Sequence, residues 1–202
     1  MTVDTQGTPE IFSVGHSNQT LRQLIGLLKQ HAIQAVVDTR SYPVSKFASQ
    51  FNRSVLEQVV PQHSIRYVFR GAELGGRPRG DEYYDAEGHV IYSRVAQADF
   101  FLDGINRLER GICKYRITLL CSEENPEHCH RRLLIGRVLA GRGVSMTHIR
   151  GDGRLEVEPP HDFGRRTGGS QHLALFRIDE DSEWRSTRSV LQRSPQASSS
   201  AH

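Results

Sequence analysis

Short apolar runs alternate along the chain with segments in which apolar residues recur at the helical period. The runs predict five buried strands, at residues 11–17, 35–40, 65–69, 115–121 and 144–149. Helices are predicted over residues 20–31, 54–60, 91–110 and 125–141. Thr20 followed by Gln23 predicts a capping box for the first helix, and Pro61 ends the second.

This alternation predicts an α/β fold, a three-layer sandwich around a mostly parallel five-stranded sheet of the Rossmann or flavodoxin-like kind. We expect one α/β domain over residues 1–150, a C-terminal extension over 151–185 with one further strand at 173–178, and a disordered tail over 186–202. In such sheets, ligands bind outside the carboxyl ends of the strands. The chemistry is therefore expected at that edge.

Composition narrows the class of protein. The chain has 202 residues, 37% of them hydrophobic, and no apolar run is long enough for a membrane helix. The polar N-terminus is not a signal peptide, and three cysteines do not make a disulfide framework. We expect a cytoplasmic protein with reduced thiols and no membrane partner. A net charge of +3 permits contact with nucleic acid but does not require it.

Polar residues follow three of the predicted strands. His16 and Ser17 end the first strand, Asp38 and Arg40 the second, and Cys121 and Glu123 the fourth. If these strands are neighbours, we expect His16, Asp38, Arg40, Cys121 and Glu123 to line one cavity. A shared catalytic or binding site is predicted there.

Several motifs resemble one known family. GHSN (15–18), VVDTRSYP (36–43), FN (51–52), LGGR (74–77), LLCSEENPEHCHR (119–131) and HI (148–149) match, in order and spacing, the family called domain of unknown function 488. The Cys-x-Glu run followed by Pro-x-x-Cys-His-Arg is the most specific part. The resemblance covers residues 11–150 and implies an α/β protein of bacterial type. It implies little about activity, although some members carry a DNA-repair label.

Cys121 precedes a predicted helix start, which favours a thiolate, while Glu123 and Glu124 oppose ionisation. A phosphatase loop needs Cys-x5-Arg, and the sixth residue after Cys121 is Glu127, so this class is excluded. A buried structural cysteine is an equally good interpretation. The Cys-x7-Cys-His spacing is not that of a structural zinc site, so no metal or other cofactor is expected.

The run from 125 to 131 reads as a helix start, with Asn125 as N-cap and Pro126 at the first position. Consecutive helical residues point about 100° apart, so Cys129, His130 and Arg131 are not expected to face one ligand together. Cys129 is expected to pack inward. One of His130 and Arg131 is expected to face the cavity.

Three hypotheses follow. In the first, the protein is an enzyme for a small anionic, nucleotide-like substrate: Cys121 and Glu123 react or polarise, Asp38 exchanges protons, and His16 or His130 orients the substrate. The anion would be held by the basic residues Arg40, Arg77 and Arg131, with Ser17 nearby. The second hypothesis is a nucleic-acid-binding accessory module, in which the glycine-rich loop around Arg77 contacts the nucleic-acid backbone. The third is a metal-binding regulatory protein. Structural ion pairs and turn glycines also explain these residues.

Overall fold

The computed structural model describes residues 8–159 and 184–190. Its centre is a sheet of six strands in the order β3-β2-β4-β1-β5-β6. The strands are β1 (Glu10–Gly15), β2 (Ala35–Asp38), β3 (Arg66–Phe69), β4 (Ile117–Cys121), β5 (Ser145–Ile149) and β6 (Leu155–Val157). All neighbouring pairs are parallel except β5 and β6. The mixed α/β class and the five expected strands are confirmed.

The sixth strand corrects the expected count of five. β6 follows a tight turn after β5 and adds an antiparallel edge strand, so the sheet extends beyond residue 150. The strand order also differs from the Rossmann order 3-2-1-4-5-6 and the flavodoxin order 2-1-3-4-5, because β4 lies between β2 and β1. The relation to those two folds is therefore limited to a mostly parallel sheet with helices on it.

The helices are shorter and more broken than predicted. They are α1 (Leu21–Gln30), α2 (Arg53–Val59), α3 (Gly71–Leu74), α4 (Tyr92–Val95), α5 (Asp99–Ile112) and α6 (Arg137–Gly141). The helix expected over 91–110 is interrupted between α4 and α5. The helix expected over 125–141 is replaced by the 3-10 turn η4 (Pro126–His128), the π-helical segment η5 (Arg131–Gly136) and α6.

The helix α1 forms as its sequence predicts. The Thr20 hydroxyl accepts a hydrogen bond from Gln23 N, and the Gln23 side chain accepts one from Thr20 N, which completes the capping box. Leu24 and Leu28, one turn apart, are fully buried against the sheet. Burying each leucine contributes about 2 kcal/mol.

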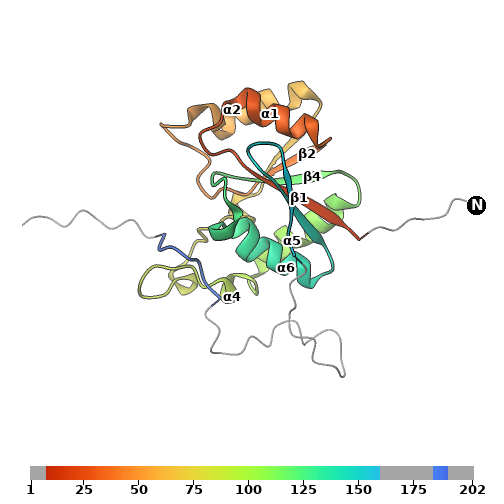
Figure 1. The fold of residues 1–202 in the computed structure, drawn as a ribbon. Coiled ribbons are helices and arrows are strands. Elements are labelled where there is room, and N and C mark those ends of the chain that lie inside the picture. Colours follow the sequence, from red (N-terminus) through yellow and green to blue (C-terminus); the bar gives the residue numbers. More distant parts are fainter. Residues whose placement is uncertain (1–7, 160–183, 191–202) are drawn as a thin grey trace, which may run out of the picture.

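Helices lie on both faces of the sheet (Figure 1), and buried apolar side chains form a core on each face. Val14, Val36 and Leu120 point toward α1 and α2, and we call this the α1–α2 face. Ile11, Leu119 and residues of α4, α5, η5 and α6 form the second core, on the α5–α6 face. The chain therefore leaves β1 and β4, which are neighbours, toward opposite faces. Such a place opens a crevice beyond the carboxyl ends of the strands.

The segment 184–190 lies against the α/β core (Figure 1). Trp184 donates from Nε1 to the Leu133 carbonyl at 2.7 Å, and its ring lies under the guanidinium of Arg137. Ser186 N donates to the Val90 carbonyl at 2.9 Å. Residues 186–190 were expected in a disordered tail, and these contacts correct that boundary. The strand expected at 173–178 lies outside the described residues.

Candidate functional site

The predicted site residues gather at the carboxyl edge of the sheet but leave it on both faces. Cys121 follows Leu120 and, by strand alternation, points with Leu119 to the α5–α6 face. Asp38 is in register with Leu120 and points to the α1–α2 face. The expectation of one cavity lined by both side chains is therefore not met. Two groups of side chains lie back to back instead.

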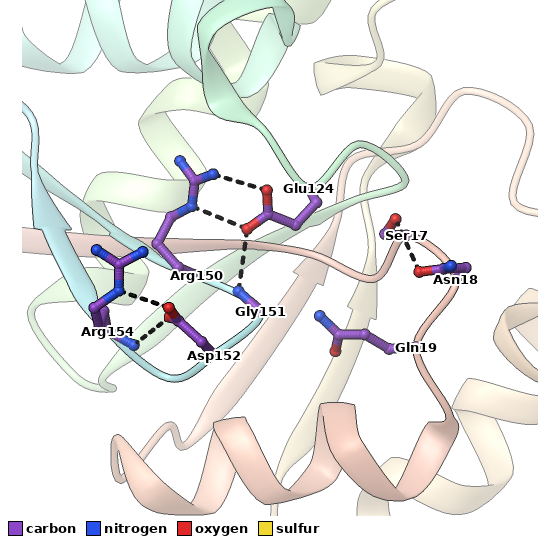
Figure 2. A pocket seen from close by; sticks show the side chains of 8 residues that line it. All are labelled: Ser17, Asn18, Gln19, Glu124, Arg150, Gly151, Asp152 and Arg154. Carbon is purple, nitrogen blue, oxygen red and sulfur yellow. Dashed lines mark hydrogen bonds and ion pairs between the residues drawn. The ribbon is translucent and has the colours of Figure 1, made fainter.

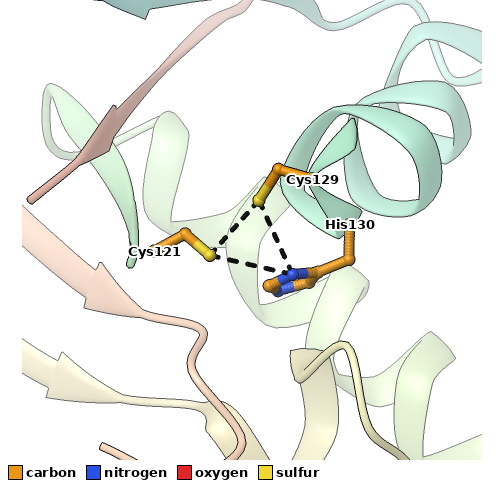
Figure 3. A group of neighbouring side chains, drawn as sticks. All are labelled: Cys121, Cys129 and His130. Atoms are coloured by element: carbon orange, nitrogen blue, oxygen red, sulfur yellow. Dashed lines mark hydrogen bonds between the residues drawn. The ribbon is translucent and has the colours of Figure 1, made fainter. Parts of the chain in front are cut away.

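The first group consists of Cys121, Cys129 and His130, and we call it the sulfur cluster (Figure 3). The two Sγ atoms are 3.2 Å apart. The His130 Nδ1 atom lies 3.9 Å from the sulfur of Cys121 and 3.8 Å from that of Cys129. All three side chains are buried, with Cys121 7% exposed and Cys129 1% exposed.

Cys129 and His130 reach the same point because Cys129 is not helical. Its backbone is extended, with φ −96° and ψ 139°, and it separates the turn η4 from the segment η5. Asn125 caps η4, accepting from Glu127 N at 3.0 Å, rather than capping one long helix. The expectation that neighbouring residues point about 100° apart is therefore wrong at this position, since it holds only inside a helix.

Hydrogen bonds set the protonation of the sulfur cluster. The hydrogen bond from Cys129 lowers the pKa of Cys121 despite its burial, and the neighbouring His130 and Arg131 lower it further. Burial, and then the hydrogen bond to Cys121, raise the pKa of Cys129. The two sulfurs thus share one proton. His130 Nε2 lies 3.2 Å from the Thr39 carbonyl oxygen, so a proton on Nε2 is donated there.

Arg131 does not face a ligand, as the sequence had suggested it could. It is 1% exposed, and its donors are occupied by protein. Nε donates to Ser13 Oγ at 3.1 Å, Nη1 to the Glu123 carbonyl, and Nη2 to the Glu124 carbonyl at 2.6 Å. A further contact joins Nη1 to Cys129 Sγ at 3.4 Å. Arg131 therefore fixes the loop after β4 and supports the sulfur cluster.

A buried network behind Arg131 was missed by the sequence analysis. Ser13 Oγ lies 2.6 Å from His148 Nδ1, and His148 Nε2 lies 3.0 Å from a carboxylate oxygen of Glu158. Arg132 donates to the same carboxylate at 2.7 Å. A serine inside an apolar strand, and the HI pair at the end of β5, were the available signals. The network holds Arg131 in place.

The second group consists of His16, Asp38 and Arg40. Asp38 is fully buried and accepts from Arg40 Nε at 2.9 Å, from Arg40 Nη2 at 2.6 Å and from the Tyr67 hydroxyl at 2.6 Å. The Arg40 backbone N donates to it as well. Burial and the hydrogen bond to Asp38 raise the pKa of Tyr67, so this hydroxyl stays protonated. With so many donors, Asp38 is suited to holding Arg40.

His16 connects the second group to the sulfur cluster. Its ring stacks on Phe51 at 4.2 Å, and its Nε2 lies 3.1 Å from Arg40 Nη1. Its backbone N donates to the Cys121 carbonyl at 3.0 Å. Burial lowers the pKa of His16, so the ring is neutral at pH 7. Neutral His16 donates from Nδ1 to the Ser17 carbonyl and accepts from Arg40 at Nε2.

The remaining predicted residues lie farther out. The side chains of Glu123 and Arg77 are exposed, and Arg77 N donates to Ser41 Oγ at 2.9 Å. Ser17 lines a separate cavity of about 270 Å³ beside β1 and β5 (Figure 2). There Glu124 is already paired with Arg150 at 2.8 Å. The cavity is lined by Ser17, Asn18, Gln19, Glu124, Arg150, Gly151, Asp152 and Arg154.

Tyr92 was also missed, because its place in a predicted long helix gave no sign of function. It is buried near the sulfur cluster. Burial raises its pKa, and the charges of Cys129 and Glu123 raise it further, so the hydroxyl keeps its proton.

No helix in residues 8–159 or 184–190 is long and apolar enough to cross a membrane.

The comparisons with known proteins add one finding. No curated protein and no solved structure matched the chain. One family model, described as "Domain of unknown function DUF488", matches residues 20–138, which include both groups except His16. Since this is more than half of the chain, the protein belongs to the DUF488 family.

Proposed function

We propose that this protein is an enzyme that acts on a small anionic, nucleotide-like substrate at the carboxyl edge of its sheet. The observation that supports this most is the sulfur cluster itself, in which two sulfurs and an imidazole nitrogen lie within 4 Å of one another. Such groups concentrate reactive electron pairs at one point. In this proposal the reaction takes place at the sulfur cluster, and the sulfur of Cys121 is its main reacting or polarising group.

The anion is assigned to Arg40. Asp38 and the Phe51 carbonyl occupy its Nε and Nη2, and Nη1 donates one of its two hydrogens to His16. The second hydrogen of Nη1 is the donor that this proposal gives to the anion. A guanidinium held in this way is prepared to bind a phosphate or carboxylate without further ordering. Asp38 becomes a positioning residue in place of the acid–base role predicted from sequence.

The loop that follows α3 supplies the outer contacts. A Cβ added to Gly76 would lie 2.8 Å from the His130 ring, so this backbone closely approaches the sulfur cluster. Arg77 comes next and is exposed, which suits it to a second contact with the substrate anion. Glu123, exposed on the loop after β4, is the carboxylate that remains for proton exchange in this proposal.

Binding and turnover test the two halves of the proposal separately. Nucleoside mono- and diphosphates and short oligonucleotides serve as probes, with binding followed by calorimetry and turnover by chromatography. Cys121→Ser should keep binding and lose at least 100-fold in turnover. The double variant Asp38→Asn/Arg40→Gln, which leaves no buried charge unpaired, should lose at least 10-fold in binding. Cys113→Ser, at an exposed cysteine, is the matched control.

Turnover by Cys121→Ser equal to that of the wild type would refute the reaction centre, and unchanged binding by the double variant would refute the role of Arg40. Absence of turnover with every probe would also count against the enzyme.

A second candidate function, a nucleic-acid-binding module linked to DNA repair, is favoured by a different observation. Tyr42 is 72% exposed and Phe47 is 101% exposed, on the connection that directly follows Arg40. Exposed aromatic rings beside arginines are the usual platform for single-stranded nucleic acid. Binding of an oligonucleotide that survives both sets of substitutions, with a steep dependence on salt, would favour this module.

A further inference from the structure

We infer that Cys121, Cys129 and His130 bind a zinc-class metal ion. The inference deepens the proposed function and rests on the position that it gives to the reaction centre. It begins from the distances among three atoms: 3.2 Å between the sulfurs, and 3.9 and 3.8 Å from His130 Nδ1 to each of them. These atoms come from two segments, the end of β4 and the connection between η4 and η5 (Figure 3).

The triangle has the size of a metal site. The point equidistant from its three corners lies about 2.1 Å from each atom, while zinc bonds are about 2.3 Å to sulfur and about 2.0–2.1 Å to nitrogen. An ion slightly out of this plane reaches all three atoms. The only adjustment is a small opening of the two sulfurs, which brings the angle at the ion toward the tetrahedral value.

The surroundings are those of ligands held for a metal. His130 donates from Nε2 to the Thr39 carbonyl, which leaves the lone pair of Nδ1 facing the two sulfurs. Arg131 Nη1 contacts Cys129 Sγ at 3.4 Å, as an outer hydrogen bond to a thiolate does. Arg131 is itself fixed by Ser13 and two carbonyls. The donor set is therefore oriented before any ion arrives.

Charge also favours an ion at this place. Two buried thiols cannot both ionise 3.2 Å apart without a compensating cation, and a divalent ion neutralises the two thiolates. Two thiolates with an imidazole select zinc and similar soft ions over magnesium or calcium. The turn of Asp85, Glu87 and His89 does not resemble this, since Asp85 is paired with Arg185 at 2.7 Å and the group lies at the surface.

The number of ligands connects the ion to the reaction centre. Three protein ligands leave one position for a substrate group, which is the arrangement of catalytic rather than structural zinc. In this arrangement Cys121 contributes as a ligand, and the bound ion polarises the substrate.

Metal content of the full chain, purified without chelator, tests the inference. We expect near one equivalent of zinc in the wild type and in Cys113→Ser. Cys121→Ser, Cys129→Ser and His130→Ala should each retain at least 10-fold less. Because these variants remove buried groups, a measurement on the wild type stands beside them: Co²⁺ added to metal-free protein should produce thiolate-to-cobalt charge-transfer bands and the visible spectrum of a tetrahedral site.

Wild-type protein with both thiols reduced that takes up neither Zn²⁺ nor Co²⁺ would overturn the inference. Zinc retained in full by Cys121→Ser and Cys129→Ser would also overturn it. The proposed function fails differently. Stoichiometric zinc without turnover of any probe keeps the metal site and removes the enzyme, whereas full turnover by metal-free protein keeps the enzyme and removes the metal.

Discussion

Arg40 donates two hydrogen bonds to Asp38, from Nε to Oδ1 at 2.9 Å and from Nη2 to Oδ2 at 2.6 Å, and both side chains are buried. Arg40→Gln removes one partner and leaves a buried carboxylate unpaired. We expect it to lower the free energy of unfolding by about 3–5 kcal/mol. Urea denaturation measures this.

The double variant Asp38→Asn/Arg40→Gln should lose clearly less than Arg40→Gln alone, because neither charge is then stranded. Arg53→Gln is the control, since its ion pair with Glu57 is exposed and screened by water. Equal losses in the single and double variants would mean that the ion pair is not what Arg40 stabilises.

Gly15 is required by the close approach of β1 to the loop after β4. A Cβ at this position would lie 1.7 Å from the Glu123 carbonyl oxygen, which Arg131 holds in place. Gly15→Ala should therefore cost about 3 kcal/mol or more, because backbone has to move. Thermal unfolding followed by circular dichroism gives the result.

Gly26→Ala is a matched control, since nothing lies within 4 Å of its added Cβ and the residue is inside α1. It should stabilise the protein by up to about 1 kcal/mol. A Gly15→Ala variant as stable as the wild type would show that the loop after β4 yields easily. The supports of the sulfur cluster would then be weaker than the contacts suggest.

What the sequence could predict depended on local regularity. The five parallel strands are short apolar runs, and the capping box of α1 is a local contact between Thr20 and Gln23, so both were readable. The strand β6 was not predicted, because it has only three residues and all of them are exposed. Its pairing depends on β5 alone.

The site failed at two points for physical reasons. The geometry of Cys129 and His130 was assigned from an ideal helix, whereas the turn η4 leaves Cys129 extended. Arg131 was assigned to anion binding because of its charge, whereas its N–H groups donate hydrogen bonds to two backbone carbonyls and to Ser13. Neither the break nor these partners is visible in the order of residue types. The gathering of strand ends at one edge was predictable because topology alone requires it.

Trp184 should contribute to stability although it lies far along the chain from the strands. Its indole donates to the Leu133 carbonyl, and its ring stacks against Arg137 and meets Tyr92 edge-on. Trp184→Ala should cost about 2–4 kcal/mol, from lost burial and an unpaired carbonyl. Denaturation followed by circular dichroism measures the loss.

Cys113→Ser, at an exposed cysteine outside both cores, should change stability by less than about 0.5 kcal/mol and serves as the control. A truncation before residue 184 should reproduce the loss of Trp184→Ala or exceed it, because Ser186 and Val190 also bond to the loop around Val90. A truncated chain as stable as the full chain would show that this segment only rests on the surface.

Stability should fall as the pH drops below about 6.5, partly through His148. Burial lowers the pKa of His148, and the charge on Arg131 lowers it further, while Glu158 and Glu156 oppose the shift. The unfolded chain then takes up a proton at a higher pH than the folded protein does. Stability is therefore fully present above the unfolded pKa, and it is lost as the pH falls toward the folded one.

His148→Gln should flatten this slope, because glutamine can still bond to Ser13 or Glu158 but does not titrate. His16, whose pKa burial also lowers, should leave part of the slope in place. Burial opposes the ionisation of Glu158, but the hydrogen bonds from Arg132 and His148 lower its pKa on balance. Glu158 therefore adds a separate loss only below about pH 4.5, so the two pH windows are distinct. Urea unfolding at a series of pH values between these limits checks the expectation, with His63→Gln as a control at a half-buried histidine.

A slope in His148→Gln as steep as in the wild type would mean that other groups carry the proton uptake, and that Ser13, His148 and Glu158 stabilise Arg131 independently of pH.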